Sequence, residues 1–166
     1  MNWRVWVLSY CLFLAISTAL NPQTSAPKPA PRSSDRAEGV AVPAEVGALL
    51  RPILDVKKEG GQHDESRLNN LLYALIQKKG HVADEALVVL MCFEVGESQE
   101  ETDAVIARGK KMLPLLRKYR DKAPNIPGAT YPDSMLKGPS SKTDTFEGAI
   151  KAINHGWRST ADNPET

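Results

Sequence analysis

The sequence is poor in cysteine and lacks the short motifs of common catalytic sites. Two cysteines occur among its 166 residues, and one of them, Cys11, lies in the apolar stretch near the N-terminus. Removal of that stretch would leave Cys92 alone, so an internal disulfide is excluded and the core has to hold the domain together. Gly-x-Ser-x-Gly, His-Glu-x-x-His and paired Cys-x-x-Cys patterns are also missing. We therefore assign no catalytic residues, no metal ligands and no cofactor from the sequence.

The protein also lacks an excess of charge of either sign. Its 21 Lys and Arg residues face 20 Asp and Glu residues, for a formal net charge of +1. Nucleic-acid-binding proteins are usually strongly basic, so we predict no nucleic-acid partner. With 42% hydrophobic and 25% charged residues, the composition is that of a folded globular protein, and the length gives room for one domain.

The N-terminus has the layout of a secretory signal peptide. Arg4 precedes a mostly apolar stretch, and the small residues Ser17 and Ala19 follow it, as the −3 and −1 pockets of signal peptidase require. We predict a signal peptide over residues 1–19 and a secreted or periplasmic protein. The alternative is a membrane-anchored protein that keeps its leader, although residues 5–20 are shorter than the about 20 apolar residues of a spanning helix.

Residues 20–43 are predicted to be a disordered linker rich in proline and serine. Residues 21–43 contain five prolines and few large apolar side chains, so they cannot bury enough surface to offset the entropy of ordering. We expect an extended, partly polyproline-like tether between the leader and the domain. The tail, residues 158–166, is also predicted to be disordered.

The middle of the sequence has apolar residues at helical spacing, which predicts an all-α fold for residues 44–157. We expect a small single-domain bundle of about five helices. These helices should cover about residues 43–60, 64–80, 84–96, 98–122 and 144–156. Pro52 should kink or split the first of them, and Pro114 should bend the fourth.

One stretch, ALVVLMCF at residues 86–93, is apolar throughout. As a buried strand it would need partner strands on both sides, and no other stretch resembles one. It is also too short to span a membrane, which takes about 18 residues or more. A helix that is apolar on every side is typical of the centre of a bundle. Cys92 is therefore predicted to be a small core residue, because a reactive thiolate needs an electropositive and partly exposed setting.

A basic helix surface is the first candidate for binding. Residues 108–122 contain seven cations and one acid, whereas residues 94–103 contain five acids and no cation. Acid near the start of a helix and base near its end complement the helix dipole, so a solvated surface explains the pattern. The alternative is a face for anionic lipid, glycan or an acidic partner, with these binding residues: Lys110, Lys111, Arg117 and Lys118.

A loop predicted for residues 123–143 is the second candidate. It is longer than the usual connection between helices, and it contains four prolines together with the apolar residues Ile126, Tyr131, Met135 and Leu136. These side chains either fold back over the end of the bundle or form an exposed anchor for a partner, since long ordered loops often carry binding.

These features together predict an exported, non-catalytic binding or structural module with a protein partner. An enzyme whose acid and base residues are dispersed in the sequence is an alternative. Its candidate acid and base residues would be His63, His81 and the acids of residues 94–103. A peripheral membrane module that uses the basic helix surface is another alternative.

Overall fold

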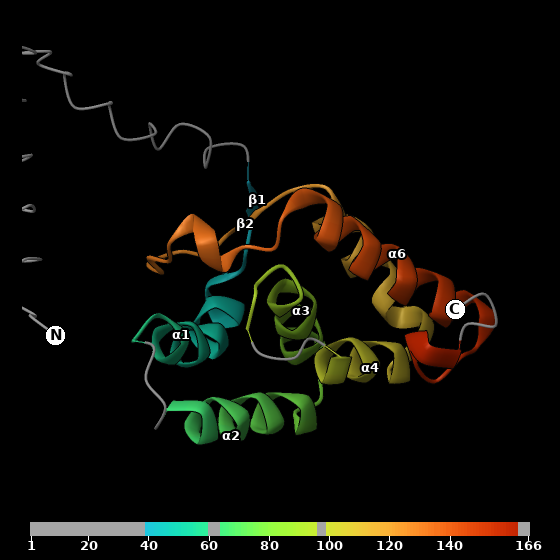
Figure 1. Cartoon of the computed structure of the whole chain (residues 1–166), viewed down its shortest axis with the longest axis horizontal. Coiled ribbons are helices and arrows are strands. Elements are labelled where there is room, and N and C mark those ends of the chain that lie inside the picture. The colour runs from blue at the N-terminus through green and yellow to red at the C-terminus, as the bar shows by residue number, and fades with distance from the viewer. Residues whose placement is uncertain (1–38, 60–63, 96–98, 163–166) are drawn as a thin grey trace, which may run out of the picture. The chain divides into compact units, whose positions relative to one another are not determined.

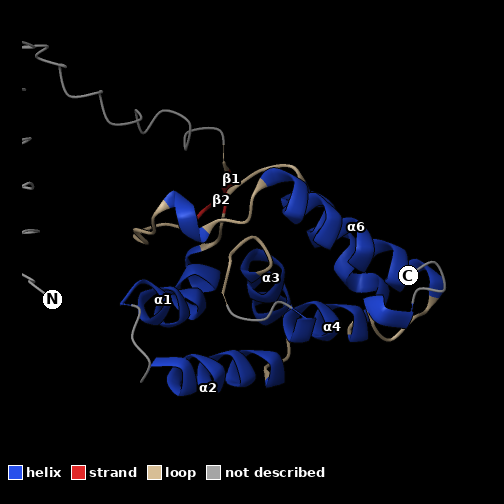
Figure 2. Ribbon diagram, viewed as in Figure 1, coloured by secondary structure: helices blue, strands red, loops and turns tan. Residues whose placement is uncertain are grey.

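The structure is a computed structural model that describes residues 39–59, 64–95 and 99–162. The predicted signal peptide, residues 20–38 of the predicted linker, His63 and the last four residues of the sequence lie outside the described residues. Helices make up most of the described part, which confirms the prediction of an all-α bundle (Figures 1 and 2).

The described part contains six α-helices, three short 3-10 helices and two strands of two residues each. The α-helices are α1 Ala44–Glu59, α2 Asp64–Gln77, α3 His81–Leu90, α4 Gln99–Ala107, α5 Leu113–Arg120 and α6 Pro139–His155. The 3-10 helices are η3 Gly109–Met112, η4 Asp133–Met135 and η5 Thr160–Asp162, and the strands are β1 Val40–Ala41 and β2 Pro124–Asn125.

Helix α3 is the centre of the bundle. It contacts α1, α2, α4 and α5 (Figure 1), and every residue from Ala83 to Leu90 is buried. The prediction that residues 86–93 form the buried middle of the fold is therefore confirmed, because all eight of these side chains are buried. Helix α1, which the sequence also predicts, continues through Pro52 to Glu59 without being split.

The end of α3 differs from the prediction, which extends the helix to Gly96. The α-helix ends at Leu90, and Phe93 forms an antiparallel bridge with Leu136. Two backbone hydrogen bonds flank this bridge, from the Glu94 N–H to the Met135 carbonyl (2.8 Å) and from the Lys137 N–H to the Cys92 carbonyl (2.9 Å). An apolar run has no period that marks where a buried helix ends, so this boundary depends on the pairing with residues 135–137.

The prediction of one long helix over residues 98–122 is wrong. Helix α4 ends at Ala107, and α5 begins only at Leu113, after η3. Gly109 between them has φ 73°, a left-handed conformation that glycine adopts without steric cost. Pro114 lies in the first turn of α5, where a missing N–H costs no hydrogen bond. The backbone therefore turns at Gly109, and Pro114 begins a helix instead of bending one.

Helix α6 begins at Pro139, well before the predicted start at Asp144. Pro139 is in the first turn, a position that favours proline because its fixed φ suits the helix. The helix ends at His155 and is capped by Gly156, which is left-handed with φ 73°, as the sequence predicts. The predicted loop of residues 123–143 is therefore shorter than expected, and it contains β2 and η4.

Strands β1 and β2 pair in parallel, with Val40 opposite Pro124. The Val40 N–H donates to the Ala123 carbonyl (2.8 Å), and the Val42 N–H donates to the Asn125 carbonyl (3.0 Å). Val42 is buried in the core. Residues 40–42 are thus part of the folded domain, although the composition of this stretch predicted a linker. At the other end, η5 extends regular structure into the predicted tail.

Candidate functional site

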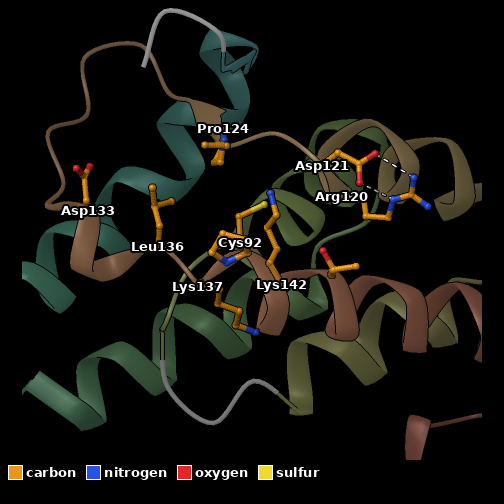
Figure 3. Close-up of a pocket in the computed structure, with 12 residues that line it drawn as sticks. Cys92, Arg120, Asp121, Pro124, Asp133, Leu136, Lys137 and Lys142 are labelled. Atoms are coloured by element: carbon orange, nitrogen blue, oxygen red, sulfur yellow. Dashed lines mark hydrogen bonds and ion pairs between the residues drawn. The ribbon is translucent and has the colours of Figure 1, made fainter. Parts of the chain in front are cut away.

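A pocket of about 490 Å³ lies where the end of α3, the end of α5 and the start of α6 meet residues 123–138 (Figure 3). We call it the α6 pocket. Its charged lining residues are Arg120, Asp121, Asp133, Lys137 and Lys142. Apolar lining comes from Cys92, Ala123, Pro124, Leu136 and Pro139.

The apolar residues predicted as a binding anchor in the loop are placed mostly in the core. Ile126, Tyr131 and Met135 are buried, and Leu136 is partly buried. Of these four, only Leu136 lines the α6 pocket. The structure thus agrees with the first of the two alternatives, in which these side chains cover the end of the bundle.

These buried side chains hold the loop that forms one wall of the α6 pocket. The ring of Tyr131 packs edge-on against Phe93 at a centroid distance of 4.9 Å, and its hydroxyl donates to the Pro124 carbonyl at 2.6 Å. Ile126 lies so close to α1 that a Cβ added at Gly47 would be 3.1 Å from its Cγ2 atom. A loop with this many buried contacts resists movement, so the wall is formed before any ligand arrives.

Lys142 places a positive charge in the α6 pocket. It lies in the first turn of α6 and is only 8% exposed. Its Nζ atom lies beside the Cys92 sulfur (Figure 3) and donates to the Lys122 carbonyl at 3.0 Å. Among the described residues, no carboxylate forms an ion pair with Lys142. A buried charge without an opposite charge is costly.

Lys137 is the second buried cation, with 7% exposure, and its amino group points away from that of Lys142 (Figure 3). Burial lowers the pKa of Lys137, while the negative charges of Glu94 and Glu101 oppose this shift. Glu101 is itself buried, and burial raises its pKa despite the opposing effect of Lys137. Lys137 and Glu101 therefore offset each other at a distance, and Lys142 has a similar distant partner in Asp121, whose pKa the Arg120 hydrogen bonds and the charge of Lys142 lower.

Cys92 forms an apolar wall of the pocket, and its burial disfavours the thiolate. It is 1% exposed, and burial raises its pKa to about 12 even though the charges of Lys142 and Lys137 oppose the shift. The thiol is consequently protonated at neutral pH, and a thiol is a poor nucleophile. The predicted core role of Cys92 is confirmed.

The other charges at the pocket largely satisfy each other. The Arg120 Nε atom donates to Asp121 Oδ1 at 2.8 Å, and Arg120 Nη1 donates to Glu147 at 2.6 Å. Arg120 therefore already has two carboxylate partners. The amino groups of Lys137 and Lys142 are therefore the lining cations with unused donor capacity, and that of Lys142 lies beside Cys92, which also lines the pocket (Figure 3).

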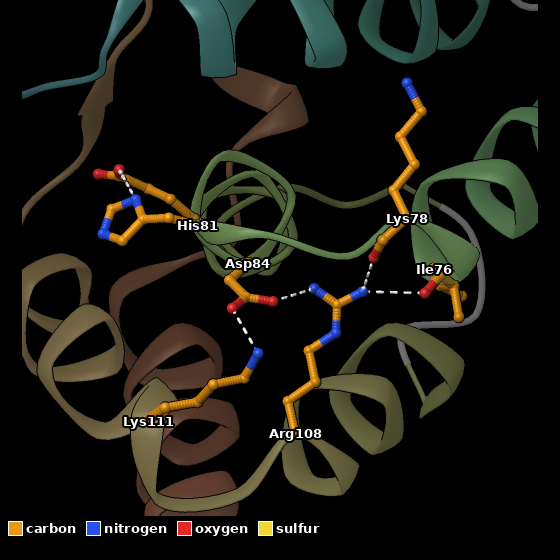
Figure 4. A network of polar contacts seen from close by, with 7 residues as sticks. Ile76, Lys78, His81, Asp84, Arg108 and Lys111 are labelled. Atoms are coloured by element: carbon orange, nitrogen blue, oxygen red, sulfur yellow. Dashed lines mark hydrogen bonds and ion pairs between the residues drawn. The ribbon is translucent and has the colours of Figure 1, made fainter.

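A polar network at the start of α3 neutralises Asp84 (Figure 4). Asp84 accepts hydrogen bonds from Arg108 Nη1 and from Lys111 Nζ (2.7 Å). The second guanidinium nitrogen of Arg108 donates to the carbonyls of Ile76 (2.9 Å) and Lys78 (2.7 Å). Arg108 therefore caps the end of α2 and ties it to α3.

Glu85 has a similar set of partners. Its Oε1 atom accepts hydrogen bonds from Lys118 Nζ and from the Tyr119 hydroxyl, each at 2.6 Å. His81 Nδ1 is 3.9 Å from its Oε2 atom. Burial raises the pKa of Glu85, but the hydrogen bonds from Lys118 and Tyr119 outweigh burial, and the net pKa is lowered. The sequence pattern predicts a helix start at Asp84 and Glu85, and α3 begins three residues earlier, at His81. Asp84 therefore lies in the first turn of α3, and both acids are buried against the neighbours of this helix.

This network divides the predicted basic face. All four side chains are exposed. Lys111 and Lys118 nevertheless direct their amino groups to Asp84 and Glu85, whereas Lys110 and Arg117 form no ion pair with another described residue. The four residues thus do not act as one free cationic surface. Among the residues that the structure describes, no group of three His, Cys, Asp or Glu side chains is placed to hold a metal ion.

Lys137 and Lys142 were not among the residues predicted from the sequence. For Lys142 a signal was available, because its spacing from Phe146, Ala149 and Ile153 puts it on the buried stripe of α6. That signal requires the helix to start at Pro139. For Lys137 there is no local signal, since its burial follows from the pairing of the neighbouring Leu136 with Phe93.

Comparison of the sequence and structure with protein-family models, with curated proteins and with solved structures gave no match. None of the helices in the described ranges is long and apolar enough to cross a membrane. By its fold and site, the described part is a helical bundle with a charged pocket at the start of its last helix.

Proposed function

We propose that the protein is an exported, non-catalytic binding module that holds a protein partner at the α6 pocket. The observation that supports this most directly is that a loop fixed by its own buried side chains forms one wall of a pocket. Binding sites are usually concave and formed in advance, and they are often placed on loops that a rigid scaffold positions.

The chemistry of the lining favours binding over catalysis. Cys92 is a protonated thiol at neutral pH, and Arg120 is already held by two carboxylates. Glu85 and Tyr119, the most closely coupled acid and hydroxyl of the described part, are both buried beneath Lys118 and do not line the pocket. A lining of this kind orients and holds a ligand without transferring protons to it.

Export is the part of the proposal that rests on the sequence. The leader over residues 1–19 directs the protein out of the cytoplasm, and the proline-rich residues that follow separate the membrane from the domain. A cleaved leader gives a secreted or periplasmic protein, and an uncleaved leader gives a membrane-anchored one with the same pocket.

Site-specific photo-crosslinking in the native host tests this function. A photoreactive amino acid replaces Thr143, which lines the α6 pocket, or Asn154, which is exposed near the opposite end of the same helix. We expect a discrete crosslinked protein from position 143 and none from position 154. Equal crosslinking at both positions, or none at either, would contradict a partner site at the pocket.

A further inference from the structure

We infer that the α6 pocket binds a single carboxylate group of its partner, with the Lys142 amino group as the counter-ion. This inference rests on the proposed function, since it names the chemical group that the partner contributes. The ligand group is a carboxylate on a short aliphatic stem. Two parts of a polypeptide carry such a group, namely its C-terminal residue and the side chain of a glutamate residue.

The buried charges of the described part differ in how they are paired. Asp84 and Glu85 each receive two hydrogen bonds from the protein, including at least one from a cation. Lys142 is buried to a similar degree, yet its hydrogen bond within the described part is to one carbonyl oxygen. Asp121 acts on Lys142 only at a distance, without forming an ion pair with it. Buried charges are normally paired, so the missing negative charge is one that a ligand can supply.

Unused hydrogen-bond donors also point into the pocket. An ammonium group has three donors, and one donor of Lys142 is used by the Lys122 carbonyl. Lys142 is in the first turn of α6, a 17-residue helix whose N-cap has no side-chain hydrogen bond. The unsatisfied N–H groups and the positive end of the helix dipole add to the attraction for an anion.

The remaining lining selects the charge and the shape of the ligand. Lys137, Lys142 and Arg120 contribute three positive charges, and Asp121 and Asp133 contribute two negative ones, so the net charge of the lining is one positive. A group with one negative charge neutralises this lining, whereas a doubly charged phosphate is repelled by the two acids. Pro124, Leu136 and Pro139 supply apolar contacts for a short aliphatic stem.

The test is a titration of the full-length protein with small-molecule probes. The amide chemical shifts of residues 138–143 report binding. The probes are N-acetylleucine, which mimics a C-terminus, and glutamate that is acetylated and amidated at its two ends, which mimics a glutamate residue within a polypeptide. N-acetylleucinamide is the neutral control, and inorganic phosphate is the competing anion. We expect saturable shifts from at least one carboxylate probe and none from the neutral amide, and the stronger carboxylate identifies the source.

Two variants assign the effect to Lys142. Lys142→Met is expected to weaken carboxylate binding about tenfold or more, because a charge-assisted hydrogen bond is lost. Lys110→Met, which removes an exposed cation, is expected to leave binding unchanged. Thermal unfolding of Lys142→Met without ligand checks folding, and we expect stability at least equal to that of the native protein, because an unpaired buried charge is removed.

Unchanged carboxylate affinity in Lys142→Met, equal shifts from the neutral amide, or tighter binding of phosphate would each overturn this inference. If Lys142→Met fails to fold, Lys142→Gln takes its place under the same criteria. Failure of the probes with crosslinking at position 143 intact would reject the carboxylate and leave the partner site standing. Carboxylate binding without any crosslinked protein would reject the proposed function alone.

Discussion

At the scale of the residue, two adjacent acids in the most apolar helix are the least expected feature of the molecule. Asp84 and Glu85 are buried in α3, where an unpaired carboxylate would be very costly. Each is neutralised by cations from η3, α5 or the turn before η3, and Tyr119 adds a neutral donor to Glu85. Removing one partner of such a buried pair leaves the other without compensation, so these contacts fix how α3 meets its neighbours.

Glu85 should make the stability of the domain depend on acid. Its folded-state pKa is lowered, because the hydrogen bonds from Lys118 and Tyr119 outweigh the effect of burial. The ionised carboxylate therefore adds stability above its unfolded pKa of about 4.3, and this stability is lost as the pH falls through the lowered pKa. We expect Glu85→Gln to lower the free energy of unfolding by about 2 kcal/mol at pH 7 and by less at pH 3.

Urea unfolding at the two pH values measures this difference. The control is Glu59→Gln, which changes an exposed acid at the end of α1 and should shift the unfolding free energy by less than about 0.5 kcal/mol. A Glu85→Gln variant whose stability follows pH in parallel with the native protein would show that Glu85 does not contribute in this way.

Single residues also show what the sequence could and could not predict. The burial of Cys92 follows from its apolar neighbours, and the structure confirms it. The burial of Glu85, Lys137 and Lys142 did not follow, because charged residues are buried only where partners or pairing from distant parts of the sequence allow it. Glu85 and Lys118, for example, are brought together by the turn at Gly109, which the hydrophobic spacing did not predict.

At the scale of the element, the turn at Gly109 decides the arrangement of α4 and α5. The apolar residues from Val105 to Tyr119 suit one amphipathic helix, and nothing in their spacing marks a break. The break comes from the left-handed conformation of Gly109, which lets Arg108 reach Asp84 on one side of the turn and Lys111 reach it on the other.

Gly109→Ala tests this explanation directly. A Cβ at this position would meet no atom within 4 Å, and the φ of 73° is the only source of strain. We expect the substitution to lower the free energy of unfolding by about 1 kcal/mol. Gly148→Ala, inside α6 and with only an ordinary contact to Thr160 at 3.5 Å, should instead raise it by about 0.5–1 kcal/mol.

Thermal or urea unfolding of the two glycine variants gives the comparison. Opposite signs support a turn that requires glycine. If both variants are stabilised, residues 99–120 form one continuous helix in solution, as the hydrophobic spacing alone predicts.

Other elements were predictable because their signals are local. The helices over α1, α2 and α6 follow from helical spacing and from glycines near their ends. The start of α6 was missed because Asp144 and Glu147 resemble a capping box, while Pro139 is an equally good first-turn residue further upstream. Local sequence rules therefore allow α6 to begin at Pro139 or at Asp144. With the start at Pro139, Lys142 is part of the helix, is buried and donates to the Lys122 carbonyl.

At the scale of the whole molecule, the class of fold was predictable and the pocket was not. A bundle around α3 follows from the contrast between one fully apolar stretch and amphipathic neighbours. The α6 pocket combines residues 92, 120–124 and 133–143. These residues are distant in sequence, and they are brought together by the bridge between Phe93 and Leu136, by the packing of α5 against α6 and by the hydrogen bond from Lys142 to the Lys122 carbonyl.

Val42 links the start of the domain to the segment around β2. Shortening its side chain measures how much this link contributes to the free energy of unfolding. Val42 is 3% exposed and its N–H donates to the Asn125 carbonyl. We expect Val42→Ala to lower the free energy of unfolding by about 2 kcal/mol, from the lost burial of two methyl groups and the cavity that they leave. Ala41→Gly, at an exposed neighbouring position, should cost about 1 kcal/mol or less. If Val42→Ala and Ala41→Gly both lower the free energy of unfolding by a small and equal amount, residues 40–42 add little to the stability of the domain.

The parallel pairing of β1 with β2 also has a mechanical consequence. Tension applied to the polypeptide ahead of residue 39 acts first on the hydrogen bonds from Val40 and Val42 to the carbonyls of Ala123 and Asn125. Ala123 and Pro124 belong to the lining of the α6 pocket. A pull on residue 39 therefore loads one wall of the pocket before it loads any helix, so that traction at the start of the domain and the shape of this wall are mechanically connected.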